Sequence, residues 1–196
     1  MSFRNWILAA VLSVIAGGAG AAPEKYTLDP SHTYPSLEFP HMGLSMWRGK
    51  FNQTSGSVTL DQAAHTGKVE IEVIMSSIDF GHDEMNEHAR SADWLDVEKF
   101  PTMNYKGKLI FDGDIPSAVD GQLTLKGITK PLRLKINTFN CLDPHPYIKK
   151  KVCGADADGE VNRADFGMDK YTDKGMGILK LHIQVEGIKD DPKAKK

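Results

Sequence analysis

The stretch that decides the fold is LKLHIQVE at residues 179–186, in which every second residue is apolar and the residues between them are polar or charged. The same alternation runs through KVEIEVIM at 68–75, with Ile74 as the exception, and through PLRLKINT at 131–138. A period of two is typical of a β-strand with one dry face and one wet face. The sequence therefore predicts antiparallel strands.

Shorter stretches of the same kind extend the pattern over most of the chain. Turn-forming sequences, such as DGD at 112–114 and KG at 126–127, separate them. A helical pattern of some strength occurs once, over residues 83–99, where it is interrupted near Ser91 and stopped by Pro101. The shorter strand candidates are Lys25–Asp29, Ser36–Phe39, Gly49–Phe51, Gly56–Asp61, Thr102–Phe111, Gly121–Lys126 and Asp156–Val161.

Eight or more strands with one apolar face must bury that face, either in a sandwich or in a closed barrel. A barrel of about eight strands can enclose one small ligand. The apolar residues include large side chains such as Phe39, Met75 and Trp94, which tolerate irregular partners. Periodicity alone leaves open whether the interior is filled by side chains or hollow.

Composition narrows the classes of protein. The chain has 196 residues, with 26 acidic and 24 basic residues and a formal net charge of −2. This length fits one domain or two small ones. The 40% apolar content is ordinary for a globular protein. The near-neutral charge argues against nucleic-acid binding driven by net charge, so no nucleic-acid partner is expected.

The N-terminal segment has the layout of a secretory signal peptide. Arg4 is a short basic region, an apolar stretch follows from Trp6 to Ala16, and small residues then lead to the AGA sequence at 19–21. The apolar stretch is shorter than the ~20 residues of a spanning helix. We expect cleavage after residue 21, export to the periplasm or the exterior, one domain over 22–190 and a charged tail over 191–196.

Export changes the interpretation of the two cysteines. Cys141 and Cys153 lie 12 residues apart, with no neighbouring histidine that would suggest metal. In an oxidising compartment such a pair usually forms a disulfide. We predict a structural Cys141–Cys153 bond; a redox-active pair is the alternative.

Several motifs together resemble the YceI-like family of exported lipid-binding proteins. They are YTLDPSH at 26–32, HMGLS at 41–45, HARSADWL at 88–95, GQLTLKGITKP at 121–131 and DFG at 165–167. The resemblance extends from about residue 26 to residue 188. Each motif is weak alone, but the ordered set at these spacings is specific.

The resemblance implies an all-β fold, an extended eight-stranded antiparallel barrel similar to lipocalins, with a short helical segment around 83–99. It also implies an elongated apolar pocket for a long-chain lipid, such as a polyisoprenoid or a fatty amphiphile, with no catalytic residue, metal or other cofactor. The sequence departs from the family where Met85 and Asn86 replace an Arg-Asp pair, which puts any role of that pair in doubt here.

A set of residues is predicted to contact the ligand in the barrel interior or at its mouth. Polar candidates at the mouth also include His88, and a solvated surface position is the alternative for each polar candidate. The predicted ligand-binding residues are Phe39, His41, Met42, Trp47, Arg48, Phe51, Met75, Ile78, Arg90, Trp94, Met103, Phe111, Leu123, Leu125, Leu134 and Phe166.

Two hypotheses of different classes follow. The first is a carrier or scavenger that holds a long apolar lipid, with transient contact to a membrane or a membrane protein and with a homodimer left open. The second is an exported enzyme with a polar or metal site near His82–His88. The two histidines are six residues apart, which places them on different sides of a helix. No metal site is therefore expected. A filled β-domain that binds a partner is a third alternative.

Overall fold

The computed structural model describes residues 22–191. The predicted signal peptide and residues 192–196 of the predicted charged tail lie outside the described residues. No helix in the described part of the chain is long and apolar enough to cross a membrane.

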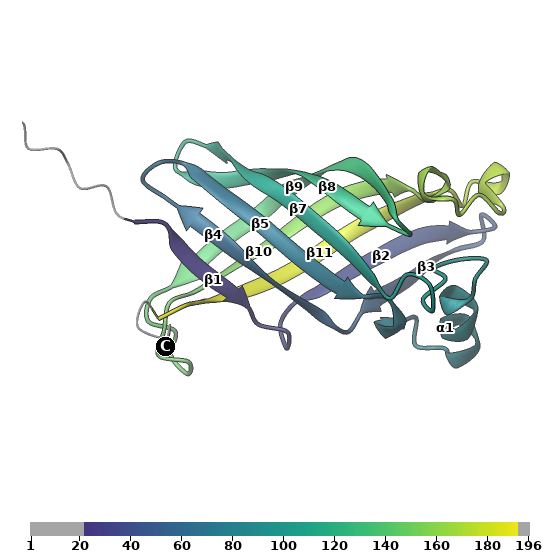
Figure 1. The fold of residues 1–196 in the computed structure, drawn as a ribbon, viewed down its shortest axis with the longest axis horizontal. Helices are drawn as coiled ribbons and strands as arrows, with labels where there is room; N and C mark the ends of the chain where they lie inside the picture. The colour runs from purple at the N-terminus through teal and green to yellow at the C-terminus, as the bar shows by residue number, and fades with distance from the viewer. Residues whose placement is uncertain (1–21, 192–196) are drawn as a thin grey trace, which may run out of the picture.

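More than half of the described residues form strands, which are joined by turns and by short helical segments (Figure 1). The three stretches with the clearest alternation lie in β5, β9 and β11, as predicted. The strands are β1 (Glu24–Leu28), β2 (Tyr34–His41), β3 (Ser45–Phe51), β4 (Thr54–Asp61), β5 (Thr66–Ile74), β6 (Ile78–Asp79), β7 (Thr102–Asp112), β8 (Ile115–Leu125), β9 (Ile128–Leu142), β10 (Val152–Asn162) and β11 (Ile178–Lys189).

Eight of these strands close into an antiparallel barrel. Their order is β1-β4-β5-β7-β8-β9-β10-β11, and β1 also pairs with β11, which joins the two edges of the sheet. Closure leaves these strands without a free edge along the pairing, which is one solution to the exposed-edge problem of β-sheets. The predicted eight-stranded barrel is confirmed.

The barrel is extended at one end because β11 is longer than β1. The part of β11 near Leu181 pairs with β2 instead, and β2 continues through β3 to β6. Helix α1 (Asp83–Arg90) and the turns η2 (Arg163–Phe166) and η3 (Thr172–Lys174) lie at this same end, on the right in Figure 1. This arrangement makes the two ends of the barrel different.

The predicted helical segment over 83–99 begins at Asp83 and is interrupted at Ser91 as predicted, but no helix resumes after the interruption. Helix α1 ends at Arg90, and Ser91 after it has an extended backbone that ends the helical hydrogen bonding. The chain then turns, with Asp96 in the left-handed region at φ 50°. The helix begins where His82 Nδ1 accepts a hydrogen bond from the Met85 amide at 3.2 Å, as an N-cap residue does.

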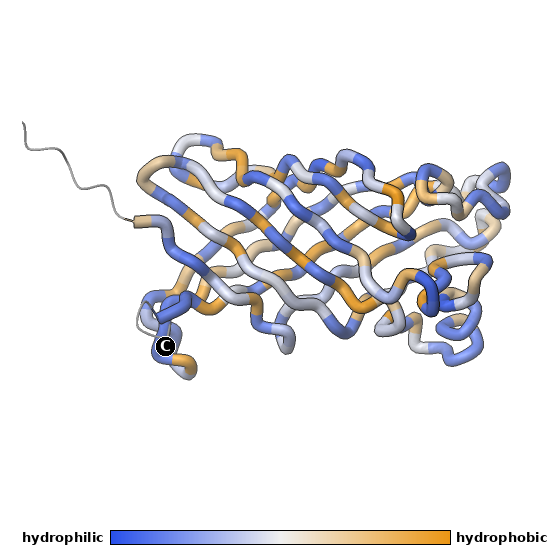
Figure 2. Tube along the Cα trace, viewed as in Figure 1, coloured by the Kyte–Doolittle hydropathy of each residue, from blue (hydrophilic) through white to orange (hydrophobic). Residues whose placement is uncertain are grey.

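Apolar and polar residues alternate along the strands, as the hydropathy colouring in Figure 2 shows. In β9, Leu132 and Leu134 are buried, whereas Arg133 and Lys135 between them are exposed. The apolar faces of the strands therefore point into the barrel, and the charged faces point to solvent.

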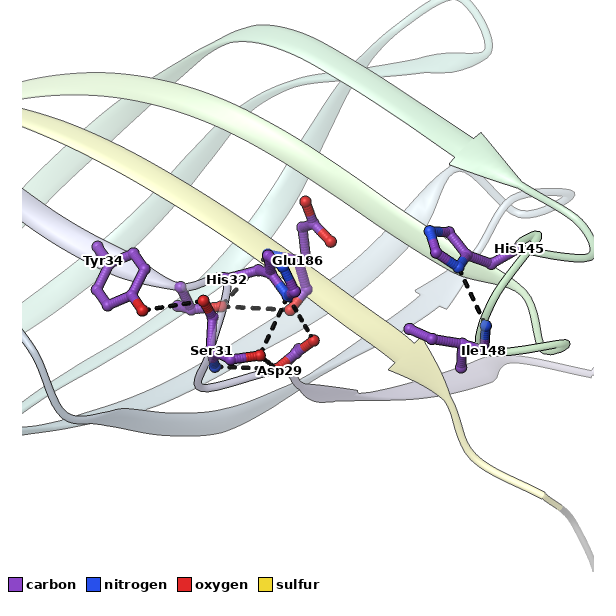
Figure 3. A network of polar contacts seen from close by, with 8 residues as sticks. Asp29, Ser31, His32, Tyr34, His145, Ile148 and Glu186 are labelled. Carbon is purple, nitrogen blue, oxygen red and sulfur yellow. Dashed lines mark hydrogen bonds and ion pairs between the residues drawn. The ribbon is translucent and has the colours of Figure 1, made fainter.

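A polar turn between β1 and β2 moves the chain from one part of the barrel wall to the next (Figure 3). Ser31 donates its backbone and hydroxyl hydrogens to Asp29, and His32 Nδ1 lies 2.8 Å from the other Asp29 oxygen. Burial raises the pKa of Asp29, but the hydrogen bonds from Ser31 and His32 outweigh burial and lower this pKa overall. The hydrogen bond to Asp29 raises the pKa of His32.

Glu24 ties the first strand to the last part of the chain. Its carboxylate accepts hydrogen bonds from Lys189 at 2.5 Å, Tyr26 at 2.6 Å and Lys151 at 2.9 Å. The hydrogen bonds from Lys189 and Tyr26 outweigh burial and, with Lys151, lower the pKa of Glu24 to about 2. In the unfolded chain this carboxyl has its ordinary pKa of 4.5, whereas in the folded protein the pKa is about 2. Folding therefore favours the ionised carboxylate, and the ionised carboxylate in turn stabilises the fold.

We expect Glu24→Gln to lower the free energy of unfolding by about 1–2 kcal/mol near pH 7, a value reduced for partial solvent exposure. Because the pKa is lowered by folding, the difference from the unsubstituted protein should be complete above pH 5. It should shrink as the pH falls from about 5 to 2. Urea unfolding at a series of pH values measures it, and a constant difference across that range would contradict the assignment.

Candidate functional site

The inside of the barrel contains a cavity of about 640 Å³. All eight strands of the barrel contribute lining residues, and so do β2, β3, β6 and α1. The lining is almost entirely apolar because it consists of the inward side of each alternating strand. Tyr105 adds little polarity to it, since its hydroxyl donates to the carbonyl oxygen of Leu132 at 3.0 Å. The volume falls in the range of small-molecule pockets.

The two ends of this cavity differ. Near the chain termini, the lining residues Tyr26, Leu60 and Cys153 are buried, and Phe139 packs against them. At the end that carries α1, η2 and η3, several lining residues are exposed, among them Met42, His88, Tyr171 and Lys174. The cavity is therefore closed at the first end, and the second end is named the open end below.

Most of the residues predicted to contact a ligand lie around this one cavity. They come from six strands, from the β2–β3 turn and from the segments before and after α1, and the fold brings them together from distant parts of the sequence. Their contact with a ligand stays a prediction. The predicted residues that line the cavity are Phe39, His41, Met42, Trp47, Phe51, Met75, Ile78, Trp94, Met103, Leu123, Leu125 and Leu134, and His88 joins them.

The two predicted arginines do not line the cavity. Arg48 is exposed on β3, where its Nε donates to Glu38 at 3.0 Å. Arg90 donates from Nε to the carbonyl oxygen of Ser76 at 2.9 Å and from a terminal nitrogen to that of Ile78. Arg90 therefore ties α1 to the wall of the barrel.

Phe111 and Phe166 also lie outside the lining. A β-bulge shifts the register between Ile110 and Phe111, and Phe111 packs against the buried cluster of Tyr26, Leu60 and Cys153 without lining the cavity. Its ring also stacks on His65, with 5.5 Å between the centroids. Phe166 is buried in the η2 turn and packs in the core.

The segment around His82–His88 does not gather its polar groups. His82 caps the helix through Nδ1, whereas the His88 ring lies 5.3 Å from that of Trp94. Within residues 22–191, no three His, Cys, Asp or Glu side chains are placed to hold a metal ion. The structure thus gives the two histidines separate surroundings, and the hypothesis of an enzyme site there gains no supporting geometry.

The polar turn of Asp29, Ser31 and His32 contains the residue types of a hydrolase triad but not its geometry. A triad histidine contacts the nucleophile with one ring nitrogen and the carboxylate with the other. Here His32 Nδ1 faces both Ser31, at 3.2 Å, and Asp29, at 2.8 Å. The imidazole cannot relay a proton between them, so we assign this turn a structural role.

The cysteine pair lies in the wall of the barrel. Cys141 on β9 and Cys153 on β10 are direct partners in the register of the two strands and form a disulfide. The predicted bond is present, and Cys153 also lines the cavity at its closed end.

Sequence reasoning missed both charged residues of the lining, Lys174 and Arg163, and of the two Arg163 is the unusual one. It is only 4% exposed, although arginine usually lies at the surface. Its nitrogens donate to the carbonyl oxygens of Met168, Lys170 and Met176. The sequence held one signal, because Arg163 lies two residues before the DFG motif at 165–167.

Comparison with known proteins agrees with this architecture. The YceI-like domain family matches residues 26–187. A UPF0312 protein of Pseudomonas putida is 33% identical over 180 residues, covering 89% of this chain and 90% of that protein. A UPF0312 protein of Shewanella denitrificans is 32% identical over 169 residues, covering 84% of this chain and 87% of that protein.

Solved structures share the fold. BcnA of Burkholderia cenocepacia superimposes with a TM-score of 0.65 at 18% identity, covering 81% of this chain and 98% of that one. A polyisoprenoid-binding domain from Saccharophagus degradans superimposes with a TM-score of 0.57 at 12% identity, covering 84% of this chain and 98% of that one. With the match of the family over nearly all of the described barrel, these findings establish that the chain belongs to the YceI-like family.

Proposed function

We propose that the protein binds and carries a long-chain apolar lipid, a polyisoprenoid or a fatty amphiphile, inside the barrel. One observation carries the proposal: an apolar cavity of about 640 Å³ that is closed at one end and open at the other. A long chain can enter such a cavity from the open end and leave its polar end there.

The energetics of burial support a lipid of this kind. Each CH₂ group moved from water into an apolar environment contributes about 0.8 kcal/mol before the costs of binding. A long hydrocarbon chain needs no further chemistry to bind well, and the proposal involves no catalytic step and no cofactor. The polyisoprenoid-binding domain that shares the fold supports the same class of ligand.

The proposal places the protein in the periplasm or outside the cell, as the predicted signal peptide implies. Loading would take place by transient contact of the open end with a membrane. Two apolar side chains at the tip of the β2–β3 hairpin support this route, since Met42 is 59% exposed and Leu44 is 83% exposed. A homodimer stays a prediction.

Filling the cavity should block binding. Leu134 on β9 lines the cavity, and Leu134→Trp places an indole in the space that the lipid chain would occupy. We expect the affinity for a fluorescent long-chain lipid to fall roughly tenfold or more, ~1.4 kcal/mol. Fluorescence titration measures the affinity, and circular dichroism checks that the variant is folded.

The matched control is Lys135→Trp, because Lys135 is the next residue of the same strand and faces solvent. It introduces the same side chain without entering the cavity and should bind as the unsubstituted protein does. Equal binding by both tryptophan variants would mean that the lipid lies elsewhere.

A further inference from the structure

The charged side chains that line the cavity are all positive. Among the described residues that line it there is no aspartate or glutamate, whereas Arg163, Lys174, His41 and His88 are present. Three of these four come from α1, η2 and η3, and His41 is the last residue of β2. The arginine, lysine and histidine side chains of the lining therefore lie at the open end, and they are cationic or neutral.

Arg163 is a buried cation with hydrogen-bond donors to spare. A guanidinium carries five N–H groups, and three of them donate to carbonyl oxygens of the η2–η3 segment. Within residues 22–191 no carboxylate lies within ion-pair distance of Arg163. Burial lowers the pKa of Arg163, and the more distant Asp169 only partly opposes this. A buried charge in these surroundings is stabilised by an anion that reaches it.

Trp94 supplies a second donor next to Arg163. The guanidinium carbon of Arg163 lies 4.7 Å from the centre of the Trp94 ring. Trp94 Nε1 is buried and has no hydrogen-bond partner in the described part of the chain. Most buried N–H groups have a partner, and leaving one without a partner is costly. Both residues line the cavity.

The rim completes the cluster. The His88 ring is 5.3 Å from Trp94, the Tyr171 ring is 6.4 Å from it, and Lys174 Nζ lies 5.5 Å from the centre of the Tyr171 ring. His88 and Lys174 are exposed, whereas Arg163 is buried. The donors thus lead from solvent into the cavity.

We infer that Arg163 and Trp94, with Lys174 and His88 at the rim, bind an anionic head group, the oxygens of a carboxylate or a phosphate, on the amphiphile whose tail occupies the barrel. The inference rests on the proposed lipid-binding function and names the chemical class of the ligand. The planar guanidinium suits both groups because its N–H pairs match two oxygens of a carboxylate or a phosphate.

Pairs of lipids with equal chains and different head groups test the inference. Geranylgeranyl monophosphate is compared with geranylgeraniol, and palmitate with hexadecanol, by displacement of a fluorescent lipid. We expect the charged member of at least one pair to bind about 10- to 100-fold more tightly than its alcohol, the effect of one charge-assisted hydrogen bond. The pair with the larger ratio identifies the phosphate or the carboxylate as the head group.

Two variants assign the effect to the cluster. Trp94→Phe keeps an aromatic ring against Arg163 and removes only the N–H group, and Lys174→Gln removes an exposed charge. We expect each to reduce the ratio of the two affinities at least threefold, because binding of the anion weakens more than binding of the alcohol. Arg48→Gln is the matched control, because Arg48 is exposed outside the cavity and its loss should leave the ratio unchanged.

The outcomes separate this inference from the proposed function. Equal binding of acid and alcohol by the unsubstituted protein would overturn the anionic head group and leave lipid binding intact. Equal loss of both affinities in Trp94→Phe would show that Trp94 acts only on the structure, and would overturn the inference as well. Binding of neither member of either pair would overturn the proposed function itself.

Discussion

Replacing Gly56 with alanine is expected to destabilise the barrel by roughly 3 kcal/mol or more, the combined effect of a steric clash and a strained backbone. Gly56 lies in β4 with φ at 149°, a conformation that L-residues seldom adopt. A Cβ atom there would collide with the backbone oxygen of Glu70 and lie 2.9 Å from Cα of Ile71. Because these are backbone atoms of the paired strand β5, no side-chain movement relieves the contact.

Thermal unfolding measures this effect. For a domain of this size, a loss of 3 kcal/mol corresponds to a fall in Tm of about 6–12 °C. Gly113→Ala is the matched control, because Gly113 also has a positive φ, 57°, but a Cβ there meets nothing within 4 Å. The control substitution should lower the free energy of unfolding by only about 1 kcal/mol, through backbone strain alone. Equal losses in the two variants would show that contact with β5 is unimportant.

Removing the disulfide is expected to have an effect of similar size. The Cys141–Cys153 bond closes a loop between β9 and β10, with 12 residues of sequence separation. In the chain-entropy model, closing a loop of this size stabilises the folded state by about 3 kcal/mol. We therefore expect the double substitution Cys141→Ser with Cys153→Ser to lower the free energy of unfolding by this amount.

A reducing agent provides the control for this prediction. It should destabilise the unsubstituted protein to about the level of the double serine variant, and it should have no effect on that variant. Urea unfolding with and without reductant gives both values. A double variant as stable as the unsubstituted protein would contradict a structural role for the bond.

The strands could be predicted wherever the two faces of the barrel wall differ in polarity. Residues 131–138 and 179–186 show this well, because each charged side chain faces solvent and each aliphatic side chain faces the cavity. Some strands were predicted to be shorter than they are. β8 begins at Ile115, six residues before the predicted start at Gly121, because the adjacent apolar residues Ala118 and Val119 are both buried and interrupt the alternation.

The helix and the closure of the barrel depend on interactions that periodicity does not encode. The predicted helix over 83–99 overruns its end at Arg90, because the hydrogen bonds of residues 91–100 form a series of turns instead. Closure requires β1 to pair with both β4 and β11, which is a property of the whole sheet. The resemblance to the YceI-like family predicted the barrel, where periodicity alone left a sandwich equally open.

The apolar part of the site and its histidines, His41 and His88, could be predicted, but its arginine and its lysine could not. Large apolar residues such as Met75 and Trp47 line the cavity because an inward position in a barrel wall favours them. Phe111 is an exception, since it lies beside a bulge and packs against the buried closed-end cluster instead of lining the cavity. Arg163 could not be predicted from residue type alone, because its burial depends on three carbonyl oxygens that the η2–η3 segment turns toward it.

Lipid in the barrel is the central claim, and mass spectrometry tests it most directly. The protein is purified without detergent, incubated with vesicles that contain polyisoprenoid and fatty lipids, re-isolated and analysed in the native state, and its bound material is then extracted with organic solvent. We predict one long-chain lipid per protein chain and its loss in Leu134→Trp. A protein that carries no lipid before incubation and takes up none from the vesicles would contradict the account.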